Sequence, residues 1–136
     1  MYKMGQHHPP IADDYFKIGR AYYYNNNLPE ADSAFTEFIE LEPESTAGYS
    51  WKGRIKLQQD SESLEGAKPY YEKVIEVGSK NPEKYKKDLL HALRFHGYYH
   101  YLKMEYVIAK SYYDRLLELS LKDQVAKDAL EVLRKL

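Results

Sequence analysis

Apolar residues recur at every third or fourth position along almost the whole chain, and strict alternation of apolar and polar residues is nearly absent. This period matches one face of an α-helix, so we predict an all-α fold. The expected helices run near residues 12–25, 29–41, 46–59, 65–77, 82–102, 105–120 and 124–136. The last is amphipathic, with one apolar side formed by Val125, Ala129, Leu130, Leu133 and Leu136.

Local start and stop signals separate these helices. The run Asn25-Asn26-Asn27 ends the first helix, and Pro29 lies near the first turn of the second, where proline is tolerated. Ser45 or Thr46 is a candidate cap for the third helix. Gly78 follows an apolar run and is typical of a helix C-terminus. The sequence Asn81-Pro82-Glu83 joins a capping residue to a first-turn proline and acid, which predicts a new helix at residue 82.

A pattern of small and aromatic residues occurs three times. The first copy reads Tyr15-x-x-Ile18-Gly19-x-x-Tyr22, then Ala31-x-x-x-Phe35, then Pro43; the others run through Gly53, Ala67 and Tyr71, and through Gly97, Ala109 and Tyr113. A glycine inside a helix costs about 1 kcal/mol relative to alanine, so three at one repeat position indicate close packing of paired helices. We expect the alanines to lie opposite the glycines. The seams should be filled by Tyr15, Ile18, Tyr22, Phe35 and Ile39.

This layout resembles the tetratricopeptide repeat (TPR), a helix–turn–helix unit of about 34 residues. The resemblance covers residues 12–136, with repeats near 12–45, 46–80 and 82–121 and a capping helix at 124–136. It implies a right-handed solenoid of antiparallel helix pairs. The predicted helix of residues 82–102 exceeds a regular repeat helix by about two turns. Residues 1–11 are expected to be a linker or the remnant of a preceding helix. Because solenoids need caps, we expect either that the chain is a piece of a longer array or that another molecule covers its N-terminal face.

The resemblance implies a protein–protein interaction module that binds a peptide segment or partner helix in a concave groove, lined by the first helix of each repeat. Groove positions lie three residues before the repeat glycine, one after it, and four or five after it. Carried over, they are Phe16, Arg20, Tyr23, Tyr24, Ser50, Arg54, Arg94, Tyr98 and Tyr101, with Leu57 as a further member. Arginine beside tyrosine is typical of interfaces. The alternative is that these side chains only cover the groove and pair with local acids.

Some members of the family hold the C-terminal carboxylate of chaperones with lysine and asparagine at groove positions. Phe16 and Arg20 occupy those positions in the first helix, so that type of clamp is not expected. An arginine fork can still hold a side-chain carboxylate through two parallel bonds. The implied ligand is therefore an extended segment with acidic and aromatic or aliphatic residues.

Charge narrows the range of partners. The 136 residues carry a net charge of −1, so we expect neither nucleic acid nor a membrane as partner. Residues 12–45 hold two basic and eight acidic residues, and residues 83–136 hold eleven basic and eight acidic residues. This asymmetry suits a dipolar partner or head-to-tail self-association, although charge runs are usually solvated helix faces. A homo-oligomer is also expected through the uncapped N-terminal face, where the first helix should expose apolar surface. No apolar run reaches the roughly 18 residues of a membrane span, so we expect a soluble chain whose localisation stays open.

Two other functions are compatible with parts of the sequence. The array can serve as a structural scaffold or self-association segment of a longer repeat protein. A more distant alternative is an enzyme with a histidine metal site, because His96 and His100 lie four residues apart with His91 nearby. No glutamate stands between them in the zinc-protease arrangement, and both fall at expected seam positions, so we interpret them as packing residues. With no cysteine and no catalytic motif in the chain, we expect no enzyme activity, metal or cofactor.

Overall fold

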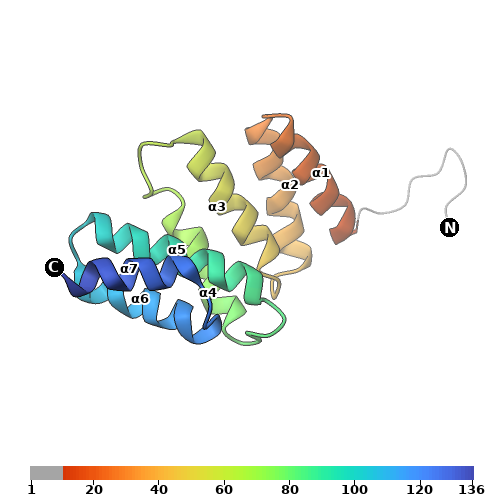
Figure 1. The fold of residues 1–136 in the computed structure, drawn as a ribbon. Coiled ribbons are helices and arrows are strands. Elements are labelled where there is room, and N and C mark those ends of the chain that lie inside the picture. The colour runs from red at the N-terminus through yellow and green to blue at the C-terminus, as the bar shows by residue number, and fades with distance from the viewer. Residues whose placement is uncertain (1–10) are drawn as a thin grey trace, which may run out of the picture.

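The computed structural model describes residues 11–136, which form seven α-helices and contain no strand. The helices are α1 (Ala12–Tyr24), α2 (Leu28–Leu41), α3 (Ala47–Gln59), α4 (Lys68–Gly78), α5 (Lys86–Leu102), α6 (Tyr106–Leu119) and α7 (Gln124–Arg134). This confirms the all-α prediction. Figure 1 shows them stacked in chain order, from α1 and α2 at one end to α6 and α7 at the other. Each helix packs mainly on its neighbours in sequence, and α3 also meets α5, so the fold is a helical-repeat solenoid.

Local signals place several helix ends correctly. α1 ends at Tyr24, directly before the three asparagines, and Asn26 takes a left-handed φ of 61°. Asparagine tolerates that conformation better than most residues, which explains the sharp stop. α2 begins at Leu28 with Pro29 in its first turn, and α4 ends at Gly78.

The start of α3 is built differently from the prediction. Thr46 is the residue before the helix, but its side chain makes no capping hydrogen bond. Its buried hydroxyl instead donates to the Asp88 carboxylate on α5, at 2.7 Å. Ser45 supplies a local bond, because its Oγ accepts the N–H of Ala47 at 3.2 Å. Thr46 therefore ties the second helix pair to the third.

Two helices begin three or four residues later than the sequence predicts. α4 starts at Lys68 rather than at residue 65, and α5 starts at Lys86 rather than at residue 82. Residues 82–85 form a turn in which the Asn81 side-chain oxygen accepts the N–H of Lys84 at 3.4 Å. α5 has 17 residues and α1 has 13, so the third repeat gains one helical turn and not two. The asparagine–proline signal marks the turn that leads into the helix.

Each repeat glycine makes room for an aromatic ring of the next helix. A Cβ atom added to the glycine would come within 2.8 Å of that ring in the first two pairs and within 2.6 Å in the third. The pairs are Gly19 with Phe35, Gly53 with Tyr71, and Gly97 with Tyr113. The rings, and not the alanines, are therefore the nearest atoms to the glycines. Ala31, Ala67 and Ala109 are nevertheless buried, as small seam residues should be.

Two residues assigned to the seams lie on the surface. Phe35 is fully buried, but Ile18 is 47% exposed and Tyr22 is 37% exposed. They border a surface hollow of about 320 Å³ on α1 and α2, together with Tyr15 and Ala34. Within residues 11–136 no other helix packs against this side of α1, so the predicted seam is an exposed apolar face.

The stripe predicted for α7 is also divided. Leu130 and Leu133 pack against the core formed with α5 and α6. Val125 and Leu136, assigned to the same apolar side, are 49% and 64% exposed. Helical spacing places residues on one side, but only part of that side meets the neighbouring helix.

Two polar residues at expected apolar positions are buried. Lys52 is 8% exposed and pairs with Asp32 at 3.3 Å, so its charge is matched. His96 is 1% exposed and stacks on Tyr112 of α6, with ring centroids 5.0 Å apart. Among residues 11–136, neither ring nitrogen of His96 has a hydrogen-bond partner.

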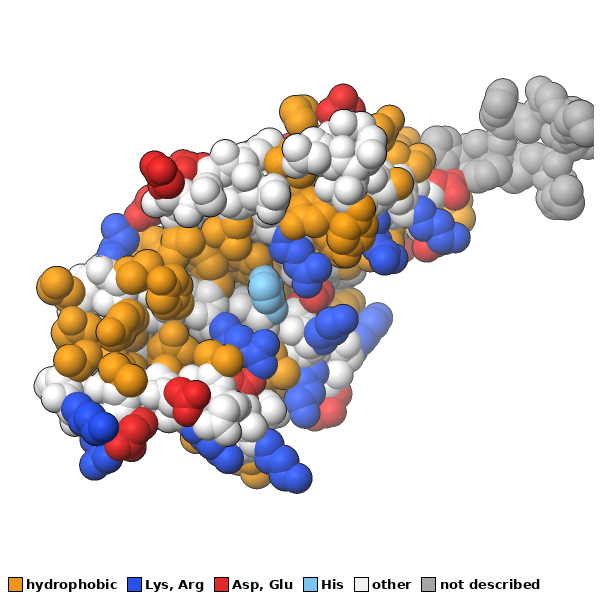
Figure 2. Space-filling model, turned by 45° about the horizontal axis from the view of Figure 1, so that its top comes forward, with side chains coloured by type: hydrophobic (Ala, Val, Ile, Leu, Met, Phe, Trp, Pro, Cys, Tyr) orange, Lys and Arg blue, Asp and Glu red, His pale blue; other side chains and the backbone are white. Residues whose placement is uncertain are grey.

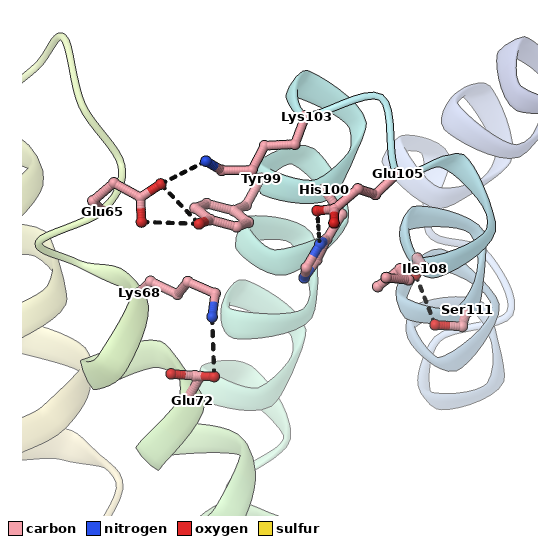
Figure 3. Close-up of polar contacts among 9 residues, drawn as sticks. All are labelled: Glu65, Lys68, Glu72, Tyr99, His100, Lys103, Glu105, Ile108 and Ser111. Carbon is pink, nitrogen blue, oxygen red and sulfur yellow. Dashed lines mark hydrogen bonds and ion pairs between the residues drawn. The ribbon is translucent and has the colours of Figure 1, made fainter.

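The long turn between α3 and α4 is fixed to the end of α5 (Figure 3). The Tyr99 hydroxyl donates to both carboxylate oxygens of Glu65, at 2.8 and 2.9 Å, and Lys103 pairs with the same carboxylate at 2.8 Å. The bonds from Lys103 and Tyr99 lower the pKa of Glu65. Lys68 and Lys103 also lie over the Tyr99 ring. None of the described helices has the length and apolar character needed to cross a bilayer.

Candidate functional site

Side chains from α1, α3, α5 and α7 share one face of the solenoid. α1 meets α3 through aromatic contacts, α3 acts on α5 through the charge of Arg54 near His91, and α5 meets α7 around Tyr98. Figure 2 shows hydrophobic side chains in two groups on one face, with basic side chains and a histidine between them. We call this face the groove; it has three parts.

The first part is the Trp51 cluster, which consists of Phe16, Arg20, Tyr23, Tyr24, Trp51 and Arg54. Trp51 on α3 stacks on Phe35 with an interplanar angle of 8° and a centroid distance of 5.6 Å. Tyr23 meets its edge at 5.2 Å. Phe35 reaches Trp51 past Gly19, so the ring behind the first glycine forms the floor of the cluster. Tyr24 is 69% exposed and extends the aromatic surface outward.

Two arginines cover this aromatic surface. The guanidinium carbon of Arg54 lies 4.6 Å from the Trp51 ring centroid, and that of Arg20 lies 5.9 Å from it. Such contacts stabilise a cation by about 0.5–1 kcal/mol at exposed sites. Neither arginine pairs with an acidic residue of the described chain. Within residues 11–136, two positive charges therefore face the groove without an acidic partner.

The middle of the groove contains Tyr71 and His91. The Tyr71 ring passes Gly53, the residue before Arg54, and its hydroxyl is 2.9 Å from Nε2 of His91. Burial raises the pKa of Tyr71, so its hydroxyl stays protonated. Burial, followed by the nearby charge of Arg54, lowers the pKa of His91. Tyr71, the ring that packs against the second repeat glycine, thus holds the half-buried His91 in the groove.

Arg94 is held by α7. Its guanidinium forms a short ion pair with Asp123, whose side chain is 3% exposed, and Asp123 also accepts the N–H of Ala126 at 2.9 Å as the cap of α7. Burial raises the pKa of Asp123, but the bonds from Arg94 and Ala126 outweigh it and lower the pKa below its usual value. Arg94 therefore positions α7. For Arg94, the alternative raised in the sequence analysis is therefore correct: the side chain pairs with an acid of the same chain, Asp123.

The third part is the Tyr98 cleft, an opening of about 260 Å³ between α5 and α7. Its lining residues are Tyr98, Tyr101, Tyr113, Asp128, Ala129 and Val132. Tyr113 is the ring behind the third glycine and forms the floor, while Tyr98 is 50% exposed. The lining is apolar apart from the tyrosine hydroxyls and Asp128. The cleft suits an aliphatic or aromatic side chain.

The predicted site residues thus fall into four sets. Phe16, Arg20, Tyr23, Tyr24 and Arg54 meet in the Trp51 cluster, and Tyr98 and Tyr101 line the cleft. Arg94 is engaged by Asp123. Ser50 is 1% exposed and Leu57 packs against the core, so neither presents its side chain openly to a ligand.

Sequence reasoning did not assign Trp51 or His91 to the groove. Trp51 lies two residues before Gly53 and His91 lies six before Gly97, so neither stands at a position carried over from the resemblance. The signal for Trp51 was available, because it is the only tryptophan and lies beside a candidate arginine. Nothing local marks His91, whose place depends on Tyr71 from another helix.

The three histidines of α5 do not share one site. His91 contacts Tyr71, His96 is buried against Tyr112, and Nδ1 of His100 bonds Glu105 at 2.9 Å. Among residues 11–136 no group of three or more histidine, cysteine, aspartate or glutamate side chains has metal-binding geometry. The histidines are therefore read as parts of the packing and of the groove.

Comparisons with known proteins agree with this architecture. A model of the tetratricopeptide repeat family matches residues 15–45, the first copy of the pattern. The C-terminal part of a TPR repeat-containing protein from Cytophaga hutchinsonii is 35% identical, with 90% of this chain and 48% of that chain covered and a TM-score of 0.83. The chain thus spans about half the length of that relative. A search of curated proteins found no match.

Two solved structures of lower identity share the fold. The Arabidopsis OM64 TPR domain is 21% identical, with 91% of this chain and 94% of that chain covered and a TM-score of 0.68. The first TPR domain of Spaghetti (RPAP3), bound to the HSP90 peptide SRMEEVD, is 15% identical, with 91% and 90% covered and a TM-score of 0.67. The helix order, the glycine–ring pairs and these matches lead to one conclusion: the chain belongs to the tetratricopeptide repeat family.

Proposed function

We propose that this protein binds an extended segment of a partner protein along the groove, and that the segment carries acidic and aromatic or aliphatic residues. TPR arrays mediate protein–protein interactions, and their stacked repeats form extended concave surfaces. The observation that carries the proposal is the Trp51 cluster, where Arg20 and Arg54 lie on one aromatic ring without an acid partner in the described chain. An acidic residue of a ligand would neutralise these two positive charges.

The three parts of the groove suggest how the ligand is patterned. An acidic or aromatic residue would lie on the Trp51 cluster, and an aliphatic or aromatic residue further along the bound segment would enter the Tyr98 cleft.

The test begins with a displayed library of random peptides selected against residues 1–136. Fluorescence anisotropy of a selected peptide is then measured for the wild type, Arg54→Ala and Tyr98→Ala at low and high salt. Arg54→Ala should weaken binding mainly at low salt, because exposed charges are screened over about 10 Å at 0.1 M. Tyr98→Ala should weaken it about tenfold at both salt concentrations, because apolar contact is not screened.

Matched controls separate groove binding from general surface effects. Arg115 lies over the Tyr112 ring on α6, 5.9 Å from its centroid, so Arg115→Ala removes a similar cation contact outside the groove. Tyr22→Ala removes an exposed tyrosine on the outer side of α1. Both controls should bind like the wild type. The proposal would be contradicted if neither groove substitution changed the affinity of the selected peptides, or if the library yielded no binding peptide.

The exposed face of α1 favours a second candidate function, self-association or scaffolding. Ile18 and Tyr22 lie beside the acidic Glu30 and Glu37 around the hollow on α1 and α2. Apolar patches rimmed by polar residues mark interaction sites. Sedimentation across a wide concentration range should then show a dimer or larger species, and Ile18→Glu should abolish it. A strict monomer at millimolar concentration would refute this second function.

A further inference from the structure

We propose that Arg54, Tyr71 and His91 form an anion subsite in the middle of the groove, where a side-chain carboxylate of the bound segment is held by Arg54 and by the protonated ring of His91. The subsite rests on the groove function proposed above and deepens it. It makes His91 a specificity residue for acidic ligands, and it makes binding depend on pH.

The geometry brings three helices to this point. Arg54 comes from α3, Tyr71 from α4 and His91 from α5. The hydroxyl of Tyr71 is 2.9 Å from Nε2 of His91, and the two ring centroids are 5.2 Å apart, so the imidazole is fixed in place. Nδ1 of His91 has no hydrogen-bond partner within residues 11–136 and is not enclosed. It remains available to donate to a ligand once the ring carries two protons.

The charges around His91 favour an anion. The groups that act on it are Arg54 from α3 and Asp88 and Arg94 from its own helix. Arg94 is paired with Asp123, and the Asp88 carboxylate accepts the Thr46 hydroxyl. Arg54 is the one of these groups that has no oppositely charged partner in the described part of the chain, so a carboxylate entering here neutralises it.

The same charges explain the pH dependence. In the empty groove, burial and then the charge of Arg54 lower the pKa of His91, so the ring is mainly neutral at pH 7.5. A bound carboxylate offsets Arg54 and favours the protonated ring. Glutamate side chains stay ionised well below neutral pH, since their ordinary pKa is about 4.3. Affinity for an acidic ligand should therefore rise as the pH falls from 7.5 to 6.0.

The experiment uses a peptide of four glutamates, acetylated and amidated so that only side-chain carboxylates are present. It is titrated into residues 1–136 at pH 7.5 and 6.0, and NMR follows the imidazole of His91 and the indole of Trp51. An ion pair at a partly exposed site contributes up to about 1 kcal/mol, so affinity should be higher at pH 6.0 than at pH 7.5, by at most about fivefold. The His91 ring signals should move with the peptide.

Three variants isolate the histidine. His91→Gln keeps a polar group near Tyr71 but cannot take up a proton, so the pH dependence should disappear. His91→Lys carries its charge at both pH values, so tight binding should be found at pH 7.5 as well. His100→Gln, which removes a histidine bonded to Glu105 at the end of α5, should keep the wild-type pH dependence.

Two results would overturn the subsite. If the peptide moves the Trp51 indole but not His91, with equal affinity at both pH values, the groove binds acidic segments without this subsite. If the peptide moves neither residue, the middle of the groove does not hold carboxylates. Peptides selected from the random library still decide the groove function separately, because their apolar residues can bind the Tyr98 cleft.

Discussion

His96 should make the domain lose stability in acid. The side chain is 1% exposed and stacks on Tyr112, and neither ring nitrogen has a hydrogen-bond partner in the part of the chain that the structure describes. Because burial penalises the charged ring, the pKa of His96 falls from 6.5 to about 4. Nearby Glu72 favours the charge, but less than burial opposes it. The folded protein therefore holds this histidine neutral over a range where the unfolded chain protonates it.

The sign and size of the effect follow from that difference. Above pH 6.5 both states are neutral at His96, so it has no effect on the free energy of unfolding. As the pH falls below 6.5, the unfolded chain binds a proton that the folded protein does not bind until about pH 4. At 1.36 kcal/mol per pH unit, the loss is about 1.4 kcal/mol at pH 5.5 and about 2.5 kcal/mol at pH 4.5. Small domains have a total stability of about 5–15 kcal/mol, so the loss is measurable.

The assay is urea unfolding of the wild type and His96→Phe at pH 7.5, 6.5, 5.5 and 4.5. Phenylalanine keeps a ring for stacking on Tyr112 and has no proton to bind, so its stability should fall less in acid. Relative to pH 7.5, the wild type should lose about 1.4 kcal/mol more than His96→Phe at pH 5.5 and about 2.5 kcal/mol more at pH 4.5. His100→Gln is the control and should keep the acid sensitivity due to His96. If the free energy of unfolding fell equally for the wild type and His96→Phe from pH 7.5 to 4.5, the reasoning would be refuted.

Three further changes test the packing. Gly53→Ala should lower the free energy of unfolding in urea by about 1–3 kcal/mol, because its Cβ would lie 2.8 Å from the buried Tyr71 ring. Gly66→Ala should not destabilise the domain, since the nearest atom to its Cβ would be 3.8 Å away, and equal effects of the two changes would disprove the close packing. Met104→Gly should stabilise the domain by about 1 kcal/mol, because the methionine has a φ of 60° that glycine adopts without strain, and a lower melting temperature would contradict this. Asp123→Ala should cost about 3 kcal/mol, because it uncaps α7 and leaves Arg94 without its acid; additive losses in a double-mutant cycle with Arg94→Ala would show that the pair is not coupled.

The positions of the elements could be predicted from the sequence because the responsible forces are local. Helical periodicity located all seven helices, and Pro29 and Gly78 marked ends through backbone constraints that act within one turn. The glycine and aromatic spacing also identified the repeat. The start of α5 was placed four residues early, because a capping asparagine followed by proline favours any tight turn and does not require a helix to follow at once.

The partners of the groove side chains were decided by the tertiary structure. The sequence predicted that both Arg54 and Arg94 face the ligand. In the structure Arg54 lies on Trp51, whereas Arg94 pairs with Asp123, the cap of α7. His91 and His96 lie on one helix, but a five-residue step turns them toward different neighbours, one into the groove and one into the core. Periodicity indicates which side of a helix a residue occupies. What lies across from that side depends on how successive helix pairs stack, and this is set by contacts between residues far apart in the chain.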